Sequence, residues 1–144
     1  MSTDVPSQPP VVAGRPRPWR LQSQGYVALL GGAAAVTAIA LMNAARLDVP
    51  KRGRALIVGT GLLGLIVDVA LIWDTRVSSS TYTVLSVLLV LVVHVTQVAV
   101  QRPHDRGAPL LSRGKDHAPM WLAGAVAILA GGALHYLVVA TLEG

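Results

Sequence analysis

The sequence has no cysteine and no phenylalanine among its 144 residues, and only 13% of its residues are charged. Without cysteine the chain can form no disulfide bond, no thiol redox centre and no thiolate metal site. An ordinary soluble domain has roughly 25% charged residues, so the low charge argues against a typical water-soluble surface. Hydrophobic residues make up 53% of the chain, and leucine, valine and alanine supply most of that apolar bulk.

Charge is almost absent from four long apolar runs, which contain one acid, two histidines and no lysine or arginine. Each run is close to the ~20 residues that an α-helix needs to cross a bilayer. A soluble protein of this length cannot bury four helices that are apolar on every side, whereas a bilayer accepts them. The sequence therefore predicts an all-α integral membrane four-helix bundle. The predicted spans are residues 26–45, 55–73, 82–100 and 120–142.

Residues 1–24 differ from the rest of the chain because they are polar and hold five of its nine prolines. Such a segment buries too little apolar area to offset its ordering entropy, which predicts a disordered tail before a single domain at 25–144. The arginines around Trp19 are predicted to anchor this tail at the membrane surface. In an alternative interpretation, residues 1–45 are a cleaved signal peptide. The run at 26–45 is longer than the usual apolar region of 7–15 residues, which favours a retained helix.

The basic residues between the runs predict an orientation in the cytoplasmic membrane. Residues 46–54 and residues 101–119 each hold four lysines and arginines, and the remaining four lie elsewhere. The positive-inside rule then places both connections in the cytoplasm and both termini outside. Three arginines in the N-terminal tail oppose this arrangement. Lipid headgroups and orientation account for the net charge of +5, so no nucleic-acid partner is predicted.

One stretch matches the dinucleotide fingerprint G-x-G-x-x-G at Gly59, Gly61 and Gly64. A true fingerprint opens an amphipathic helix and is followed by further strands and helices. Here the chain stays apolar apart from Asp68, and no such alternation follows. We therefore interpret the glycines as smoothing one face of a membrane helix, and no cofactor is predicted.

The third connection contains two histidine–aspartate pairs, His104-Asp105 and Asp116-His117. These side chains are suitable ligands for a divalent transition metal. Nothing in their spacing forces them together, and the prolines and glycines around them favour a solvated loop. No metal site is predicted.

The two ionisable residues in the second and fourth runs are predicted to lie at one depth. Asp68 lies five residues before Trp73, and His135 lies five residues before Ala140. At ~1.5 Å per residue, both lie about 7–8 Å below the outer edge of the bilayer core. The pair has three interpretations: a hydrogen bond that fixes helix packing, a proton or cation site, or an Asp68 that reaches surface water.

A second polar group is predicted in the inner half of the bilayer, where Asn43, His94 and Gln97 share a layer. Small residues spaced by about one helical turn are predicted to let helices pack closely. These packing residues are Gly31 and Ala35 in the first run, Thr60 and Gly64 in the second, and Ala123, Ala127 and Gly131 in the fourth.

No catalytic residue is predicted, because Asp68 is the only acid inside the runs and no paired carboxylate is available. The leading hypothesis is a non-catalytic membrane protein that self-associates or is an accessory subunit of a larger complex. The alternative is a small transporter or a proton or cation pathway that uses Asp68 and His135. By size and four spans the chain resembles the small multidrug-resistance transporters. Their membrane carboxylate is a glutamate in the first helix, whereas residues 26–45 contain no acid. A membrane enzyme acting on lipid ranks last.

Overall fold

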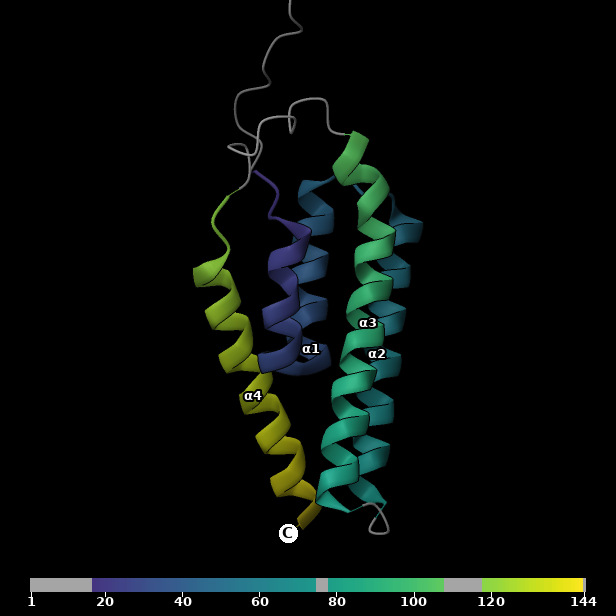
Figure 1. Ribbon diagram of the computed structural model, residues 1–144, viewed down its shortest axis with the longest axis vertical. Helices are drawn as coiled ribbons and strands as arrows, with labels where there is room; N and C mark the ends of the chain where they lie inside the picture. The colour runs from purple at the N-terminus through teal and green to yellow at the C-terminus, as the bar shows by residue number, and fades with distance from the viewer. Residues whose placement is uncertain (1–16, 75–77, 108–117, 144) are drawn as a thin grey trace, which may run out of the picture.

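The structure is a computed structural model that describes residues 17–74, 78–107 and 118–143. All the regular elements in these ranges are helical, which confirms the predicted all-α class (Figure 1). They are a 3₁₀-helix η1 (Leu21–Ser23) and four α-helices, α1 (Gln24–Arg46), α2 (Lys51–Trp73), α3 (Ser79–Gly107) and α4 (Trp121–Glu143). By length and composition, three described helical stretches are suited to crossing a membrane, namely Leu21–Arg46, Lys51–Trp73 and Ser79–Asp105.

Helix α1 is not straight, because it doubles back at Gly32. The backbone of Gly32 has φ 71° and ψ −170°, which is not helical. The Trp19 N–H donates a hydrogen bond of 2.7 Å to Asn43 Oδ1, although a straight helix separates residues 24 positions apart by ~36 Å. The run predicted as one crossing at 26–45 is therefore a helical hairpin whose two arms return to the same end of the molecule (Figure 1).

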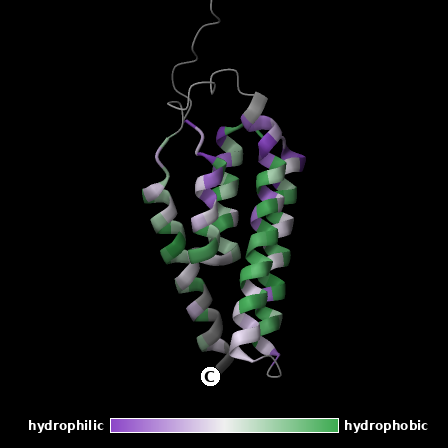
Figure 2. Ribbon diagram, viewed as in Figure 1, coloured by the Kyte–Doolittle hydropathy of each residue, from purple (hydrophilic) through white to green (hydrophobic). Residues whose placement is uncertain are grey.

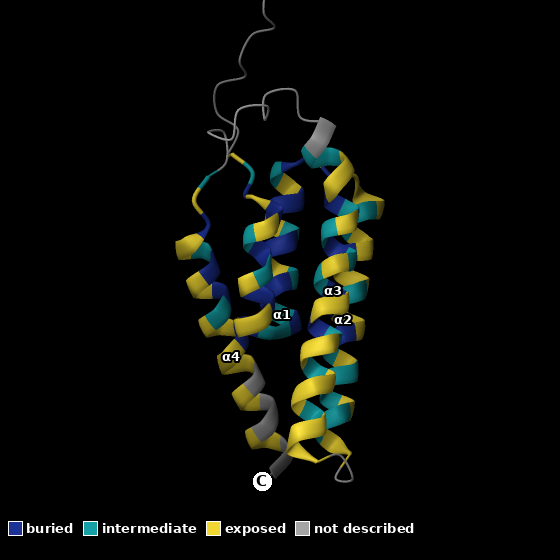
Figure 3. Ribbon diagram, viewed as in Figure 1, coloured by how far each residue is buried: buried dark blue, intermediate teal, exposed yellow. Residues whose placement is uncertain are grey.

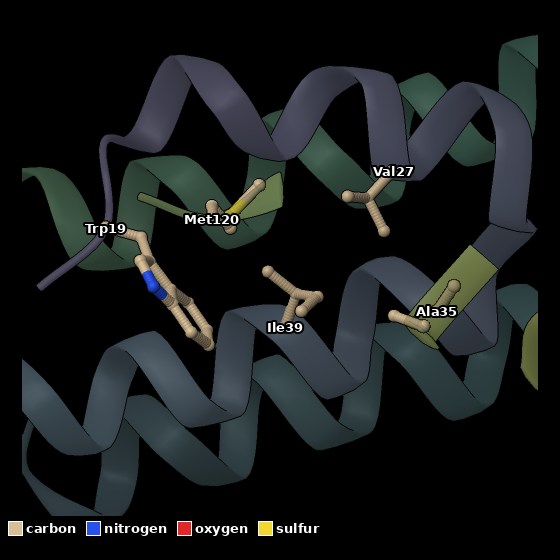
Figure 4. Packing of buried hydrophobic residues seen from close by; sticks show 6 residues of the cluster. Trp19, Val27, Ala35, Ile39 and Met120 are labelled. Carbon is tan, nitrogen blue, oxygen red and sulfur yellow. The ribbon is translucent and has the colours of Figure 1, made fainter. Parts of the chain in front are cut away.

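Close packing of small and branched side chains holds the two hairpin arms together. Val27 on the first arm packs with Ala35 and Ile39 on the second, and Trp19 and Met120 complete this buried cluster (Figure 4). Small alanine side chains let the two helical arms approach closely. The hairpin is therefore a packed part of the core.

The hairpin brings the beginning of the described chain to the end where α1 meets α2. Arg46 Nη1 donates 2.8 Å to the carbonyl of Arg17, and the Ala118 N–H donates 3.0 Å to the carbonyl of Pro18. We call this the basic end, because every described lysine and arginine lies there (Figure 2). These residues are Arg17, Arg20, Arg46, Lys51, Arg52, Arg54, Arg102 and Arg106.

The opposite end of the bundle, which we call the far end, holds the end of α2, the beginning of α3 and the last turn of α4 (Figure 1). The described N-terminal segment and the C-terminal end of α4 thus lie at opposite ends. The reason is the hairpin, which adds a return within a run that was predicted as one crossing. The predicted sidedness of the termini stays a prediction, because residues 1–16 lie outside the described part.

The helices differ in how extensively they pack on one another. The most extensive interfaces join α1 to α4 and α1 to α3, followed by α2 with α3, whereas α2 and α4 touch only slightly. Gly31 and Ala35 of α1 meet Gly131 and Ile128 of α4 so closely that a Cβ on either glycine would clash. The small faces of the first and fourth runs are thus used within the molecule, and Ala123 and Ala127 pack in the same cluster.

On α2 the small residue nearest the hairpin is Gly61, which faces Thr37, and Gly64 faces Val93 and Ala33. Thr60, which was predicted to belong to the packing face, is half-buried, and its hydroxyl donates to carbonyls of its own helix at 2.9 and 3.1 Å. The packing face of α2 therefore keeps the predicted Gly64 and includes Gly61 in place of Thr60.

Two boundaries also differ from the predicted ones. Trp19, expected in a disordered tail, is only 3% exposed, and helical structure begins at Leu21; residues 1–16 lie outside the described part. Helix α3 continues through Pro103 to Gly107, so the beginning of the predicted third connection is helical. At its other end, Ser78 Oγ accepts the Thr81 N–H at 3.3 Å, as expected for an N-cap.

Much of the outer surface of α2, α3 and α4 is exposed (Figure 3), and many of the exposed residues there are large and apolar. Leu129 is 74% exposed and Trp73 is 71% exposed. So much exposed apolar area is unfavourable in water and is ordinary against lipid. The surface therefore fits a protein whose helices contact the acyl chains of a bilayer.

Candidate intramembrane polar site

Three fully buried amide side chains form a cluster inside the basic end. Gln24 begins α1, Asn43 lies near its end, and Gln101 comes from α3. Asn43 Nδ2 donates 3.0 Å to Gln101 Oε1, and the amides of Gln24 and Gln101 exchange longer hydrogen bonds of 3.4 and 3.5 Å. Buried amides are costly unless paired, so this cluster fixes how both hairpin arms sit against α3.

The base of the hairpin is closed by Trp19. Its backbone N–H binds Asn43, and its ring lies 3.8 Å from the guanidinium carbon of Arg46. A cation over an indole face is attracted by the ring quadrupole. Arg46 also donates to the Arg17 carbonyl, so one arginine ties the segment before η1 to the end of α1.

From this cluster, hydrogen bonds continue along the second arm toward the hairpin tip. Gln101 Nε2 donates 3.2 Å to the Gln97 carbonyl, and Gln97 Nε2 donates 2.8 Å to Thr37 Oγ1. The Thr37 hydroxyl in turn donates 2.6 Å to the carbonyl of Ala33, the first residue after the fold-back. We call this series, from Asn43 to Ala33, the amide ladder.

Two buried polar atoms beside the ladder have no hydrogen-bond partner among the described residues. They are Gln97 Oε1 and His94 Nδ1, three residues apart on α3. Of the predicted inner layer, the structure brings Asn43 and Gln97 into one network through Gln101. It leaves His94 half-buried beside them, with Nε2 against Gly25 of α1.

Asp68 lies on the other side of the hairpin tip, in the far half of α2. Its Oδ1 accepts hydrogen bonds from the Ser86 hydroxyl at 2.9 Å and from the Tyr82 hydroxyl at 3.3 Å, both on α3. The carboxyl group is half-buried. The two hydrogen bonds join the far half of α2 to the first turns of α3.

A cavity of about 40 Å³ joins Asp68 to the hairpin tip. Its wall includes residues 31–34 at the tip, Asp68 and its neighbours on α2, and Gly131 and Leu134 on α4. This volume exceeds the roughly 10–15 Å³ that one water needs, and its lining includes a carboxylate and the peptide groups of the fold-back. The cavity is therefore large enough and polar enough to hold water.

The predicted Asp68–His135 pair stays a prediction. Asp68 and Leu134, the residue before His135, line the same cavity. The side chain of His135 lies outside the described atoms. The partners that the structure gives Asp68 are the α3 hydroxyls, which the sequence analysis did not single out.

The depths of these groups follow from the rise of α2. Counting ~1.5 Å per residue from Arg54 at the basic end, Gly61 opposite Thr37 lies at ~10 Å and Gly64 opposite Ala33 at ~15 Å. Asp68 then lies at ~21 Å and Trp73 at ~28 Å, a length close to the ~30 Å thickness of a bilayer core. The hairpin tip is thus about halfway along this part of α2, and Asp68 lies beyond it.

Sequence reasoning missed several of these polar residues because they fall outside the apolar runs or carry hydroxyls. The missed residues are Gln24, Gln101, Thr37, Tyr82 and Ser86. One signal was available, since His94, Gln97 and Gln101 are spaced by three and four and thus share one helical face. No comparable pattern marks Gln24, which stands at the boundary of the polar tail.

Two sequence motifs were interpreted as non-functional, namely the glycine motif of the second run and the histidine–aspartate pairs of the third connection. Gly59, Gly61 and Gly64 lie in the middle of the continuous helix α2, so they form no strand-to-helix turn. Within 17–74, 78–107 and 118–143, no three His, Cys, Asp or Glu residues are grouped as metal ligands. Asp116 and His117 lie outside those ranges.

Comparison with known proteins adds no relative. No protein-family model matches the chain, and no curated protein or solved structure shows significant similarity to it.

Proposed function

We propose that this chain is an integral membrane protein that crosses the bilayer with α2, α3 and α4, while α1 enters and leaves from the basic end. The positive-inside rule then places the basic end in the cytoplasm and the far end outside. The N-terminal arginines, which oppose an arrangement with four crossings, support this one. The hairpin removes the conflict because it moves the tail to the side of the other basic residues.

We further propose that the molecule is a small proton or cation pathway centred on Asp68. The observation that carries this proposal is the succession of polar groups through an otherwise apolar bundle. The amide ladder extends from the basic end to the hairpin tip, the cavity joins the tip to Asp68, and Ser86 and Tyr82 continue toward the far end.

Physical cost supports a functional reading of this arrangement. Non-helical backbone at bilayer depth is tolerated only where protein covers it or water reaches it. A carboxylate in the same place is expensive and usually faces a wet cavity or an ion path. Water is also the ordinary partner for buried atoms such as Gln97 Oε1 and His94 Nδ1. A hydrated path supplies partners for the fold-back peptide groups, for the Asp68 carboxylate and for these two buried atoms. A purely structural role accounts only for the hydrogen bonds that join Asp68 to α3.

Purified protein in liposomes that contain a pH-sensitive dye tests this proposal. Under an imposed potential, the wild type should acidify or alkalinise the lumen faster than protein-free liposomes. Asp68→Asn should reduce the added flux at least ten-fold and keep the unfolding midpoint, because asparagine preserves shape and cannot carry the charge or proton. Asp74→Asn is the matched control, since this exposed carboxylate at the end of α2 lies outside the cavity. Sodium and potassium gradients, in separate runs, distinguish cations from protons.

A second candidate is the non-catalytic subunit that self-associates or joins a membrane complex. Its support comes from Gly59 and Gly132, where an added Cβ would meet no atom within 4 Å. Such small positions on an outer face leave room for a helix of another chain. The same variants separate the two candidates. If wild-type flux equals that of empty liposomes, and Asp68→Asn lowers the unfolding midpoint or the mass measured by light scattering, the pathway is refuted and the subunit is favoured.

A further inference from the structure

A hollow of about 380 Å³ lies on α3 near the basic end, away from Asp68. Its described lining comes from residues of α3 spaced by three and four, which therefore share one face. They are His94, Val95, Val98, Ala99, Arg102 and Pro103. Val95 is 63% exposed, so this side of the hollow points away from the core, whereas Val98 on the other side packs against the core.

The residues that line the hollow follow one another along α3, and thus along the bilayer normal in the orientation proposed above. Arg102 is at the end of the hollow nearer the basic end of the molecule. His94 is eight residues deeper in the membrane, or ~12 Å along the helix. At the deep end, the His94 ring lies against Gly25 of α1, which closes the hollow toward the bundle. Between the two polar ends, the wall is made by Val95, Val98 and Ala99. A depression on the lipid-facing surface of a membrane protein is filled by lipid, because bulk water does not reach it there.

The positive charge of Arg102, at the entrance of the hollow, favours lipids with an anionic headgroup. The Arg102 side chain is exposed and has no hydrogen bond or ion pair with any described residue. Arg54, by contrast, is occupied with the Val49 carbonyl at 2.8 Å. Asp105 lies one turn beyond Arg102 and does not line the hollow. A guanidinium in this position offers paired donors to a phosphate, the geometry that arginine favours.

We propose that this hollow binds one anionic glycerophospholipid, with its phosphate on Arg102 and one acyl chain along Val95, Val98 and Ala99. The site is separate from the Asp68 cavity. It requires only that α3 be embedded in a bilayer, and it stands whether or not the protein carries protons.

Native mass spectrometry of the full chain in detergent tests the site with phosphatidylglycerol and phosphatidylcholine of matched chains. The wild type should retain phosphatidylglycerol preferentially. Arg102→Gln should weaken that binding about five-fold, the factor that matches the ~1 kcal/mol of one basic side chain near a membrane surface. Arg52→Gln is the control, because it removes the same charge from an exposed position at the same end.

Further variants separate the lipid from bulk charge and from free phosphate. Val98→Trp should reduce binding of both lipids, because the indole fills the groove for the acyl chain. Arg102→Lys should restore part of the preference. The proposal is overturned if Arg102→Gln and Arg52→Gln weaken binding equally, which indicates bulk charge only. It is also overturned if glycerol phosphate without acyl chains displaces the lipid, or if Val98→Trp binds as the wild type does.

Discussion

At the scale of single residues, the interior of this molecule is organised by neutral amides. Gln24, Asn43, Gln97 and Gln101 are all fully buried. An amide has both donors and an acceptor, so each can join two chain segments without the desolvation cost of a charge. In hydrocarbon the alternative to pairing is an unsatisfied polar group, and the cluster therefore specifies one position of the hairpin against α3.

Removing the shared partner of this cluster should destabilise the fold. Gln101→Ala leaves the Asn43 and Gln24 amides without their α3 partner, and we expect unfolding to become easier by about 1–2 kcal/mol. The measurement is unfolding in mixed micelles followed by tryptophan fluorescence, because Trp19 is bound to Asn43 and reports on this region. Gln22→Ala, at an exposed position, is the control. Equal effects of the two substitutions would show that the cluster contributes no stability.

The site residues were only partly predictable from the sequence. Asn43 and Gln97 stood out because polar side chains are rare inside apolar runs. Asp68 stood out for the same reason, yet its partners Ser86 and Tyr82 did not, since hydroxyl residues are common in membrane helices and carry no charge. Matching depth suggested His135 as a partner for Asp68. Depth alone cannot say which helices are neighbours, and α3 supplies the described partners of Asp68.

At the scale of elements, the feature that sequence reasoning could not predict is the fold-back of α1. Hydropathy measures whether a run of residues is apolar enough to enter a membrane. Residues 26–45 have the same hydropathy whether they form one straight helix or a hairpin. The difference lies in local backbone chemistry at the Gly31-Gly32 pair and in the polar residues near both ends of the run. Those residues gain partners only when the arms return to one end, because Trp19 then binds Asn43, and Gln24 and Asn43 both bind Gln101.

The fold-back makes Gly32 sensitive to substitution. Its φ of 71° with ψ −170° belongs to a region that is essentially restricted to glycine. Gly32→Ala should therefore cost about 1–3 kcal/mol of stability, even though an added Cβ meets no atom within 4 Å. Gly59→Ala is the matched control, because it is equally open but helical and should be neutral or stabilising by up to ~1 kcal/mol. Micelle unfolding of both variants is the measurement, and a neutral Gly32→Ala would contradict the hairpin.

At the scale of the whole molecule, the hairpin decides the sidedness of the chain. With three crossings and one return, every described basic residue is at one end. With four crossings, Arg17 and Arg20 lie across the membrane from Arg46 and Arg52. Since lysine and arginine near short loops set orientation, the fold with the hairpin agrees better with the charges than the fold predicted from hydropathy. The overall class was readable from composition, whereas the path of the chain required the contacts of Trp19 and Asn43.

The sidedness gives a sharp test, because the absence of cysteine allows single-cysteine labelling in an otherwise natural chain. The variants are Gln22→Cys, Pro50→Cys and Ser79→Cys, all at exposed positions. In intact bacterial cells, a membrane-impermeant maleimide should label position 79 only, and lysis should expose positions 22 and 50. Position 22 is diagnostic, because four crossings with external termini place it on the same side as 79. Labelling of 22 and 79 together would refute the hairpin, whereas labelling of 22 and 50 without 79 would retain the hairpin and reverse the orientation.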